Sequence, residues 1–403
     1  MERTLGPFIK KISKGFPVLL LTGPRQIGKT WLLREITEPD RNYVSLDDLG
    51  DRVLANSDPE LFFQKYKPPL IIDEVQYAPG LFTYIKIYVD THKKDGLFWL
   101  TGSQKFHLMQ GIQESLAGRV AILDMLGFSQ KELRGRACDS VPFLPSPDWM
   151  NRKDEKDMTV QEMYRLIWEG SFPKIQANPN TDRDTFYKSY IKTYIERDVK
   201  DFHNITNELA FYNFLSIAAA RTGNLLNYND FARDAGIDIK TVKLWLSILE
   251  RSGLVIFLRP WFINRTKRMI KTPKLYFLDT GLCSYLTGWD TPETLEKGAL
   301  SGAILETWVF TEILKSYWHN GKEPHLFFYR DHDQQEIDFV IEQNGMLYPM
   351  EVKKTAAPGK TDLRNFGALT KLGKSVGQGA VLCFRPGYQP LNREVMAMPV
   401  WGI

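Results

Sequence analysis

The sequence has little cysteine and no apolar run long enough to cross a membrane. Its three cysteines, Cys138, Cys283 and Cys383, lie far apart and follow neither a CxxC nor a Cys/His ligand spacing. This pattern argues against a zinc site and against a disulfide framework. No stretch reaches the roughly 18 to 20 uninterrupted apolar residues of a membrane-spanning helix, and the first residues lack the cleavage site of a signal peptide. We therefore expect a cytoplasmic protein without a membrane partner.

An excess of charge of one sign is also lacking. The 403 residues include 52 Lys and Arg against 48 Asp and Glu, a formal net charge of +4. Such a balance does not identify a nucleic-acid binder by overall charge, so any basic surface must be local. The chain is 43% hydrophobic and exceeds the roughly 250 to 300 residues that one core usually supports, which predicts a globular protein of several domains.

Four units are predicted along the chain, and the fold class is α/β. Residues 1–127 contain five short apolar runs separated by helical or loop segments, which is typical of a parallel sheet between helices. Residues 128–206 show helical spacing and are interpreted as a helical lid. Residues 207–279 contain three helical stretches followed by two apolar runs, the pattern of a winged helix. Residues 280–403 follow the order helix, three strands, helix, strand.

The first unit contains a phosphate-binding signature. Residues 23–30 fit GxxxxGK[ST] directly after an apolar run and directly before a helical pattern. Glycines allow main-chain N–H groups to converge on phosphate, Lys29 can reach the terminal phosphates, and the Thr30 hydroxyl can ligate Mg²⁺. The residues expected to contact the nucleotide are Gly23, Pro24, Arg25, Gln26, Ile27, Gly28, Lys29, Thr30 and Trp31. The sequence therefore predicts a site for ATP and Mg²⁺.

Two carboxylates follow the third apolar run of this unit. Asp73 is expected to hold Mg²⁺, and Glu74 to orient or activate the attacking water. This pair distinguishes a hydrolase from a protein that only holds nucleotide, although a core strand that merely leads into an acidic loop has the same pattern. The next run, residues 97–101, is followed by Ser103, which is expected at the nucleotide as a sensor of the γ-phosphate unless it only ends a strand.

The sequence resembles the prokaryotic AAA-type ATPases that carry a C-terminal DUF4143 domain. The runs that carry the resemblance are LLLTGPRQIGKTWLLREI, YVSLDDLGDR, LIIDEVQ, WLTGSQ, SLAGR, WEGSFP and YIERDV, and the resemblance covers essentially the whole chain. The resemblance implies an ASCE P-loop core, a helical and winged-helix middle, and a C-terminal domain similar to restriction endonucleases. Trp31 and Gly127 depart from the family, which more usually has a smaller residue and a proline at these positions.

Two arginines are candidates for stabilising charge on the γ-phosphate. Arg119 precedes the last core strand, where the resemblance implies an arginine that reaches the nucleotide of a neighbouring subunit in a homo-oligomer. Arg197, in the run YIERDV, is the alternative and would act within its own chain. An ordinary surface ion pair is the competing interpretation of each residue.

A local basic surface is predicted between residues 255 and 278. This segment contains six basic residues and no acidic one, interleaved with aromatic residues. The basic residues are Arg259, Arg265, Lys267, Arg268, Lys271 and Lys274. A winged helix with such a segment is expected to contact the phosphate backbone of DNA. Binding of a protein partner, or simple solvation of the basic residues, remains an alternative.

The last unit contains a PD-(D/E)xK arrangement. Asp338 lies in one apolar run, Glu351 and Lys353 lie in the next, and Asn344–Gly345 between them predicts a hairpin turn. Side chains alternate along a strand, so Glu351 and Lys353 share a face. Asp338 and Glu351 are expected to hold Mg²⁺, with Glu306 as a further carboxylate, while Lys353 orients water or stabilises the phosphate. A unit that keeps this fold but cleaves nothing is the alternative.

These patterns together predict an Mg²⁺-dependent ATPase that couples turnover to action on DNA through its winged-helix and nuclease-like units. The first alternative is a nucleotide-dependent signalling switch, in which hydrolysis is slow and the C-terminal unit is an inactive module that binds protein or DNA. The second alternative is a metal-dependent nuclease that ATP licenses.

Overall fold

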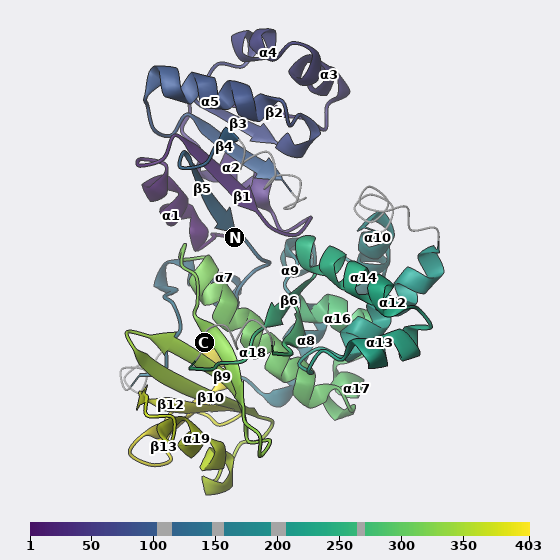
Figure 1. The fold of residues 1–403 in the computed structure, drawn as a ribbon, viewed down its shortest axis with the longest axis vertical. Coiled ribbons are helices and arrows are strands. Elements are labelled where there is room, and N and C mark those ends of the chain that lie inside the picture. Colours follow the sequence, from purple (N-terminus) through teal and green to yellow (C-terminus); the bar gives the residue numbers. More distant parts are fainter. Residues whose placement is uncertain (103–114, 147–156, 195–206, 264–270) are drawn as a thin grey trace.

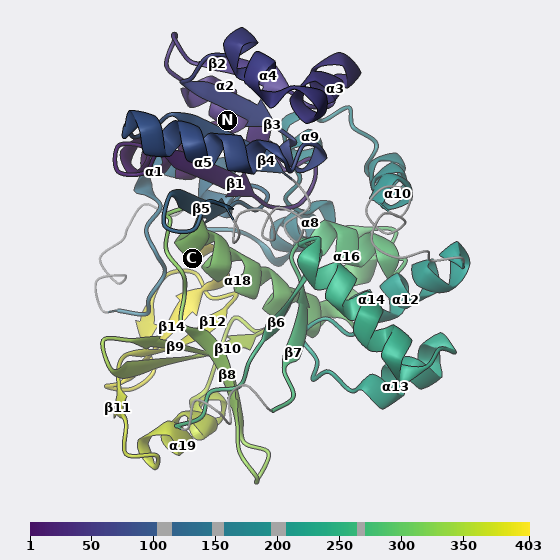
Figure 2. The same cartoon turned by 45° about the horizontal axis from the view of Figure 1, so that its top comes forward.

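The structure is a computed structural model that describes residues 1–102, 115–146, 157–194, 207–263 and 271–403. The N-terminal sheet and its helices lie at the top of Figure 1, a group of helices lies beside and below them, and a second sheet forms the bottom. The long helix α18 (Ser301–Trp318) runs through the middle in Figures 1 and 2. Among the described residues no helix is both long and apolar enough to span a bilayer.

The N-terminal sheet is parallel, as predicted from the five apolar runs. Its strands are β1 (Val18–Thr22), β2 (Asn42–Ser45), β3 (Leu70–Asp73), β4 (Phe98–Gly102) and β5 (Val120–Asp124). Its helices are α1 (Leu5–Ile12), α2 (Lys29–Ile36), α3 (Leu49–Ser57), α4 (Pro59–Lys65) and α5 (Leu81–His92), with a 3₁₀ turn at Val75–Tyr77. The strand order is β2-β3-β4-β1-β5.

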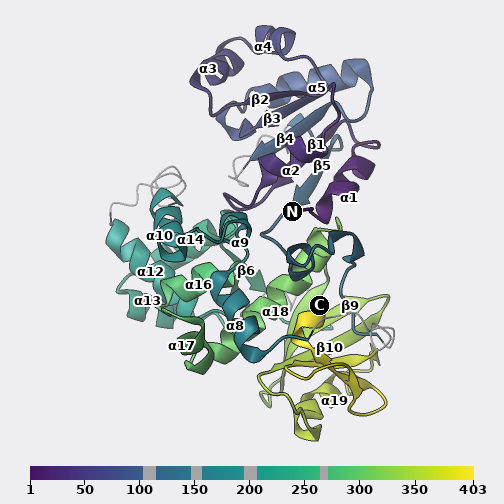
Figure 3. The same cartoon turned by 180° about the vertical axis from the view of Figure 1, so that it is seen from behind.

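Both faces of this sheet are covered, which explains its continuous apolar strands. Leu19 and Leu21 pack on one face with residues of α1 and α2, whereas Val18 and Leu20 pack on the other with residues of α4 and α5. The two groups of helices lie on opposite sides of the sheet in Figures 2 and 3. Because β4 lies between β1 and β3, the loops that follow these three strands meet at one edge of the sheet.

The middle of the chain is mainly helical. Its elements are α7 (Gln130–Leu133), a 3₁₀ turn at Ala137–Asp139, α8 (Val160–Glu169), α9 (Pro173–Ala177), α10 (Arg183–Tyr194), α12 (Glu208–Ala220), α13 (Tyr228–Ala235), α14 (Ile239–Arg251), β6 (Val255–Leu258), β7 (Lys274–Phe277), α16 (Thr280–Leu286) and α17 (Pro292–Lys297). Strands β6 and β7 form an antiparallel ribbon. Helices α16 and α17 pack against α8, so residues beyond 279 help to build this region.

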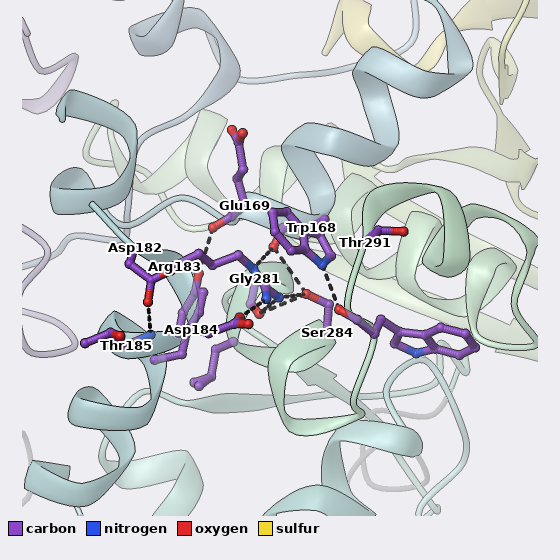
Figure 4. A network of polar contacts seen from close by, with 12 residues as sticks. Trp168, Glu169, Asp182, Arg183, Asp184, Thr185, Gly281, Ser284 and Thr291 are labelled. Carbon is purple, nitrogen blue, oxygen red and sulfur yellow. Dashed lines mark hydrogen bonds and ion pairs between the residues drawn. The ribbon is translucent and has the colours of Figure 1, made fainter. Parts of the chain in front are cut away.

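A buried arginine joins three of these helices, as Figure 4 shows. Arg183 donates hydrogen bonds to the main-chain oxygens of Trp168 (2.8 Å) and Gly281 (3.2 Å) and to Ser284 Oγ (2.7 Å). Its guanidinium also lies 3.8 Å from the ring centre of Trp168. A buried guanidinium needs such a set of acceptors. The WEGSFP run, which begins at Trp168, thus lies at the junction of α8, α10 and α16.

The C-terminal sheet has seven strands. Its elements after α18 are β8 (Leu326–Arg330), β9 (Glu336–Gln343), β10 (Met346–Lys353), a 3₁₀ segment at Lys360–Phe366, α19 (Gly367–Thr370), β11 (Ser375–Val376), β12 (Gly379–Cys383), β13 (Gln389–Pro390), β14 (Val395–Pro399) and a 3₁₀ turn at Val400–Gly402. The main order is β13-β14-β12-β10-β9-β8. Strands β9 and β10 form the hairpin expected at Asn344–Gly345, where both residues have a positive φ.

Candidate functional site

The loop between β1 and α2 is shaped by left-handed residues. Gly23 has φ 141° and Gly28 has φ 89°. A Cβ on Gly23 would lie 2.1 Å from the main-chain oxygen of Met125, so only glycine fits there. Gly28 is the N-cap of α2 and supplies no side-chain cap, which leaves the first N–H groups of the helix to face the loop. The geometry is therefore that of an anion-binding loop.

The predicted lysine lies within this loop. Lys29 Nζ donates hydrogen bonds to the main-chain oxygens of Gly23 (2.9 Å) and Pro24 (2.7 Å), and the side chain is buried. These acceptors are neutral carbonyls at the start of the loop. A phosphate in the loop would replace them with charged oxygens, which make stronger hydrogen bonds with an ammonium group.

The predicted magnesium ligands are brought together across the sheet edge. Thr30 Oγ1 donates a hydrogen bond to Asp73 Oδ1 over 2.8 Å, and Tyr43 donates one to Asp73 Oδ2 over 3.3 Å. Thr101 Oγ1 also donates to Asp73 Oδ1. Hydroxyl and carboxylate oxygens are ligands that Mg²⁺ prefers, and one or two of them suffice when phosphate oxygens and water complete its coordination shell. These residues therefore fit Mg²⁺ bound with a nucleotide.

Glu74 lies beside this pair in an unusual backbone conformation. Its φ of 54° places a non-glycine residue in the left-handed region, which proteins tend to retain at functional sites. Its main-chain N–H donates to Thr101 Oγ1 over 3.2 Å, and its carboxylate accepts a hydrogen bond from Gln76. Thr101 thus holds both Asp73 and Glu74. It is the penultimate residue of β4, which lies next to β3, and strand alternation could have identified it from this position.

The carboxylates predicted in the last unit also approach one another. Met350 pairs with Phe339 in the β9–β10 hairpin, which brings Glu351 opposite Asp338. Glu351 Oε2 lies 2.9 Å from Lys353 Nζ, whereas its buried Oε1 has no hydrogen-bond partner in the described part of the chain. Burial, and then the neighbouring charge of Asp338, raise the pKa of Glu351 to about 8.

A lysine from the middle region completes this carboxylate cluster. Lys274, on β7, places Nζ 3.0 Å from Glu306 Oε1 and 2.7 Å from Glu336 Oε1. Tyr276, on the same strand, donates a hydrogen bond to Glu306. We use the name carboxylate cluster for Glu306, Glu336, Asp338 and Glu351. Neither Lys274 nor Glu336 was expected here, because neither residue belongs to the PD-(D/E)xK motif.

This position corrects one expectation from the sequence. Lys274 is 3% exposed and cannot face a DNA backbone as part of a basic wing. Arg259 and Lys271 are exposed. The other three residues of the predicted basic surface, Arg265, Lys267 and Arg268, lie outside the described residues. A count of basic residues does not distinguish a solvated lysine from one that is drawn inward by carboxylates.

The carboxylate cluster does not fit a divalent metal as arranged. In residues 1–102, 115–146, 157–194, 207–263 and 271–403, no three His, Cys, Asp or Glu side chains are grouped to hold an ion. Glu306 is directed to Lys274 and Tyr276. Metal binding by Glu306, Asp338 and Glu351 therefore stays a prediction from the sequence.

Three family models match separate parts of the chain. Residues 15–134 match an AAA domain, residues 160–293 match a domain of unknown function (DUF8612), and residues 301–403 match a domain of unknown function (DUF4143). The chain combines an AAA domain with a C-terminal DUF4143 domain. The resemblance read from the sequence motifs is confirmed, and the AAA domain is of the P-loop ATPase type.

Relatives and solved structures were found at low identity. The uncharacterised proteins Rv2008c of Mycobacterium tuberculosis and Mb2031c of Mycobacterium bovis are each 29% identical over 344 residues, covering 85% of this chain and 71% of theirs. A RuvB variant from Thermotoga maritima is 16% identical over 62% of this chain and 85% of its own, with a TM-score of 0.29. A Signal Transduction ATPase with Numerous Domains (STAND) protein from Pyrococcus horikoshii is 14% identical over 75% of this chain and 44% of its own, with a TM-score of 0.27.

Arg119 lies at the edge of the N-terminal sheet that is opposite the P-loop, as we call residues 23–30. It immediately precedes β5, whereas the P-loop follows β1, and the two strands run parallel from Val18 and Val120. Arg119 makes a bidentate ion pair with Asp90 of α5, at 2.6 and 3.0 Å. It therefore cannot reach phosphates bound in its own chain. Arg197 and Ser103, the other two predicted contacts of the γ-phosphate, lie outside the described residues.

A cavity of about 360 Å³ lies beside the P-loop of the AAA domain. The P-loop and the end of β5 form one wall, and the turn between α14 and β6 forms another, with Trp318 of the DUF4143 domain at its margin. The turn comes very close to the P-loop, because a Cβ on Gly253 would lie 3.1 Å from Pro24 Cγ. The AAA domain thus shares its P-loop surroundings with later parts of the chain.

A buried polar network also joins the P-loop to the DUF4143 domain. Arg3 donates hydrogen bonds to the main-chain oxygens of Ile27 (3.3 Å) and Leu126 (2.6 Å), and pairs with Glu132 over 3.2 Å. His319, at the end of α18, accepts from the N–H of Leu126 through Nε2, which leaves the proton on Nδ1, 3.4 Å from Glu132. Burial alone would raise the pKa of Glu132, but the adjacent His319 ring and the charge of Arg3 lower it overall.

Proposed function

We propose that the AAA domain binds ATP with Mg²⁺ and hydrolyses the terminal phosphate. The observation that carries this proposal is the meeting of the P-loop, the Thr30–Asp73 pair and Glu74 at one edge of the sheet. The AAA family and the P-loop context support it. The main-chain N–H groups of residues 23–29 and the Lys29 ammonium bind the phosphates, while Thr30 and Asp73 hold Mg²⁺, which neutralises phosphate charge when bound.

The chemistry assigned to Glu74 follows from its place. A carboxylate at this position can accept a proton from water aimed at the γ-phosphate. Thr101 accepts a hydrogen bond from the main chain of Glu74 and donates one to the carboxylate of Asp73, so it ties the two residues together. Gln76 holds the Glu74 side chain and must release it when water binds.

Charge that develops on the phosphate needs a further donor. Arg119 can supply it only to a second copy of the chain, because of its place at the opposite sheet edge. Arg197 is the candidate within the same chain, and Ser103 the candidate sensor. An oligomer is part of the proposal only for Arg119, whose ion pair with Asp90 must then open.

We further propose that nucleotide turnover is coupled to action on DNA through residues 207–279 and 280–403, with residues 1–127 as the ATPase core and 128–206 as the lid. The order of three helices and a ribbon is in keeping with a winged helix, and the order α18, β8, β9, β10, α19, β12 with a nuclease-like fold. The second candidate is a signalling switch whose DUF4143 domain is an interaction module. The burial of Lys274 and the engagement of Glu306 favour that candidate.

ATP turnover measured with and without duplex, single-stranded and supercoiled DNA tests both candidates. Coupling to DNA predicts faster turnover with at least one of these nucleic acids, whereas the switch predicts slow turnover that DNA does not change. Lys29→Ala is expected to abolish both binding and turnover. Turnover in Lys29→Ala equal to that of the wild type would contradict the ATPase assignment itself.

A further inference from the structure

The β6–β7 ribbon is docked on the edge of the DUF4143 sheet. The segment that follows β6 pairs with β8: Phe328 N donates to Arg259 O over 3.2 Å, and Trp261 N donates to Phe328 O over 2.6 Å. Trp261 is completely buried in the hydrophobic core of that sheet, and its indole N–H donates to Glu342. The ribbon therefore forms a continuous surface with the DUF4143 domain, and Lys274 of β7 enters the domain from it.

Lys274 is held as a charged group. Its ammonium faces carboxylates of the cluster, among them Glu306 and Glu336. Two of those carboxylates lie within 3.0 Å of Nζ. A buried ammonium is tolerated only where such partners surround it. Lys274 is thus a positive charge that the middle region contributes to the cluster.

The same carboxylates would be needed by a divalent cation. Asp338 and Glu351 face one another across the hairpin, and Glu351 Oε1 is buried without a hydrogen-bond partner in the described part of the chain. A further carboxylate of the cluster, Glu306, is engaged by Lys274 and Tyr276. A second cation close to the Lys274 ammonium would be repelled by it, and most strongly so in a buried site.

We infer that Lys274 stands in the carboxylate cluster in place of a divalent cation, so that docking of the ribbon and binding of a metal ion exclude each other. The inference does not depend on ATP hydrolysis, and it does not require the DUF4143 domain to cleave anything. According to this inference, the docked ribbon prevents a metal ion from binding to the cluster. Metal enters only when β7 withdraws Lys274, and Glu306 then becomes available beside Asp338 and Glu351.

Binding of Mn²⁺ to nucleotide-free protein, followed by electron paramagnetic resonance, tests the inference without an activity assay. Wild type and Asp338→Asn are expected to bind Mn²⁺ equally, because the cluster is closed in both. Lys274→Met is expected to gain one Mn²⁺ site whose affinity is at least tenfold higher than that of the wild-type protein for Mn²⁺. The double variant Lys274→Met/Asp338→Asn is expected to lack this site. Lys271→Met, an exposed lysine on the same segment, should behave as wild type.

Two results would overturn the inference. One is wild-type Mn²⁺ binding that weakens in Asp338→Asn, since the cluster would then accept metal with Lys274 in place. The other is a folded Lys274→Met protein that gains no site. If the single variant does not fold, Lys274→Met/Glu336→Gln, which removes a surplus negative charge, takes its place. The comparison of wild type with Asp338→Asn shows whether the cluster accepts metal with Lys274 in place, and it does not depend on the folding of the Lys274 variants.

Discussion

The P-loop and the carboxylate cluster each contain a buried lysine, but the two lysines have different partners. Lys29 donates to two main-chain carbonyls of its own loop, whereas Lys274 pairs with two carboxylates from other elements. A hydrogen bond to a neutral acceptor contributes about 0.5 to 1.5 kcal/mol net, while breaking a buried ion pair costs about 3 to 5 kcal/mol. The P-loop lysine can therefore change partners when phosphate arrives, and the cluster lysine is fixed until its strand moves.

The largest expected effect concerns the acidic residue at the P-loop. Glu74→Gln should bind ATP as the wild type does and lose about 10²- to 10⁴-fold in turnover, because proton transfer from water is removed. Steady-state phosphate release and nucleotide binding measure the two quantities separately. Glu35→Gln, an exposed residue of α2, is the matched control. Equal turnover in Glu74→Gln and wild type would remove Glu74 from its assigned role.

The next effect tests how firmly the cluster lysine is fixed. Lys274→Met should destabilise the DUF4143 domain by about 3 to 5 kcal/mol, because two carboxylates lose their cation. Urea denaturation followed by the fluorescence of the buried tryptophans measures the loss. Lys271→Met should stay within about 0.5 kcal/mol of wild type, as exposed positions usually do. If Lys274→Met lost no more stability than Lys271→Met, the ion pairs of Lys274 would contribute little to the stability of the domain.

The stability of the carboxylate cluster and that of the network behind the P-loop should respond to pH in opposite directions. The pKa of Glu351 is raised to about 8, so its stabilising protonated form is lost as the pH rises through 8, and the DUF4143 sheet should weaken. The pKa values of Glu132 and His319 are lowered, so the network behind the P-loop should weaken as the pH falls below about 6.5, and further below about 4.5.

Hydrogen exchange of the amides of α7 and β10 across pH 5 to 9 distinguishes the two responses. Glu351→Gln should flatten the alkaline response of β10, since its side chain no longer titrates. His319→Gln should flatten the response of α7 near pH 6. Parallel pH profiles for α7 and β10 would contradict the assigned directions.

The smallest effect concerns the contact between the α14–β6 turn and the P-loop. Gly253→Ala introduces a methyl group 3.1 Å from Pro24 at a φ of 72°, and should weaken nucleotide binding a few-fold. Gly236→Ala has a similar φ of 64° with no heavy atom within 4 Å, so it reports the backbone cost alone. Equal nucleotide affinities in the two variants would show that the turn does not influence the P-loop.

Contiguous signals were predicted well from the sequence. The P-loop motif, the strand that ends at Asp73 directly before Glu74, and the β9–β10 hairpin each lie within a short segment, and residues 15–134 match the model of an AAA domain. The parallel sheet followed from apolar runs, because a strand buried on both faces has no polar alternation. Binding of DNA, the domain boundaries and the assigned catalytic roles stay predictions.

Contacts between distant segments could not be predicted in the same way. Arg3, Glu132 and His319 meet from three parts of the chain, and none of them belongs to a motif. Lys274 was grouped with neighbouring basic residues, because composition does not show that α18 brings Glu306 to within 3.0 Å of it. Such pairs depend on how the helices pack, which the spacing of residues along one segment does not determine.

Helix α18 has one consequence for how the molecule could transmit a signal. Glu306, in its second turn, belongs to the carboxylate cluster, and His319, at its other end, accepts a hydrogen bond from the segment behind the P-loop. These residues are 13 positions apart, a distance of about 20 Å along a stiff helix. A displacement of that segment when nucleotide binds would therefore shift or rotate α18 as a rigid unit. The ion pair between Glu306 and Lys274, at the other end of the helix, would then weaken or strengthen.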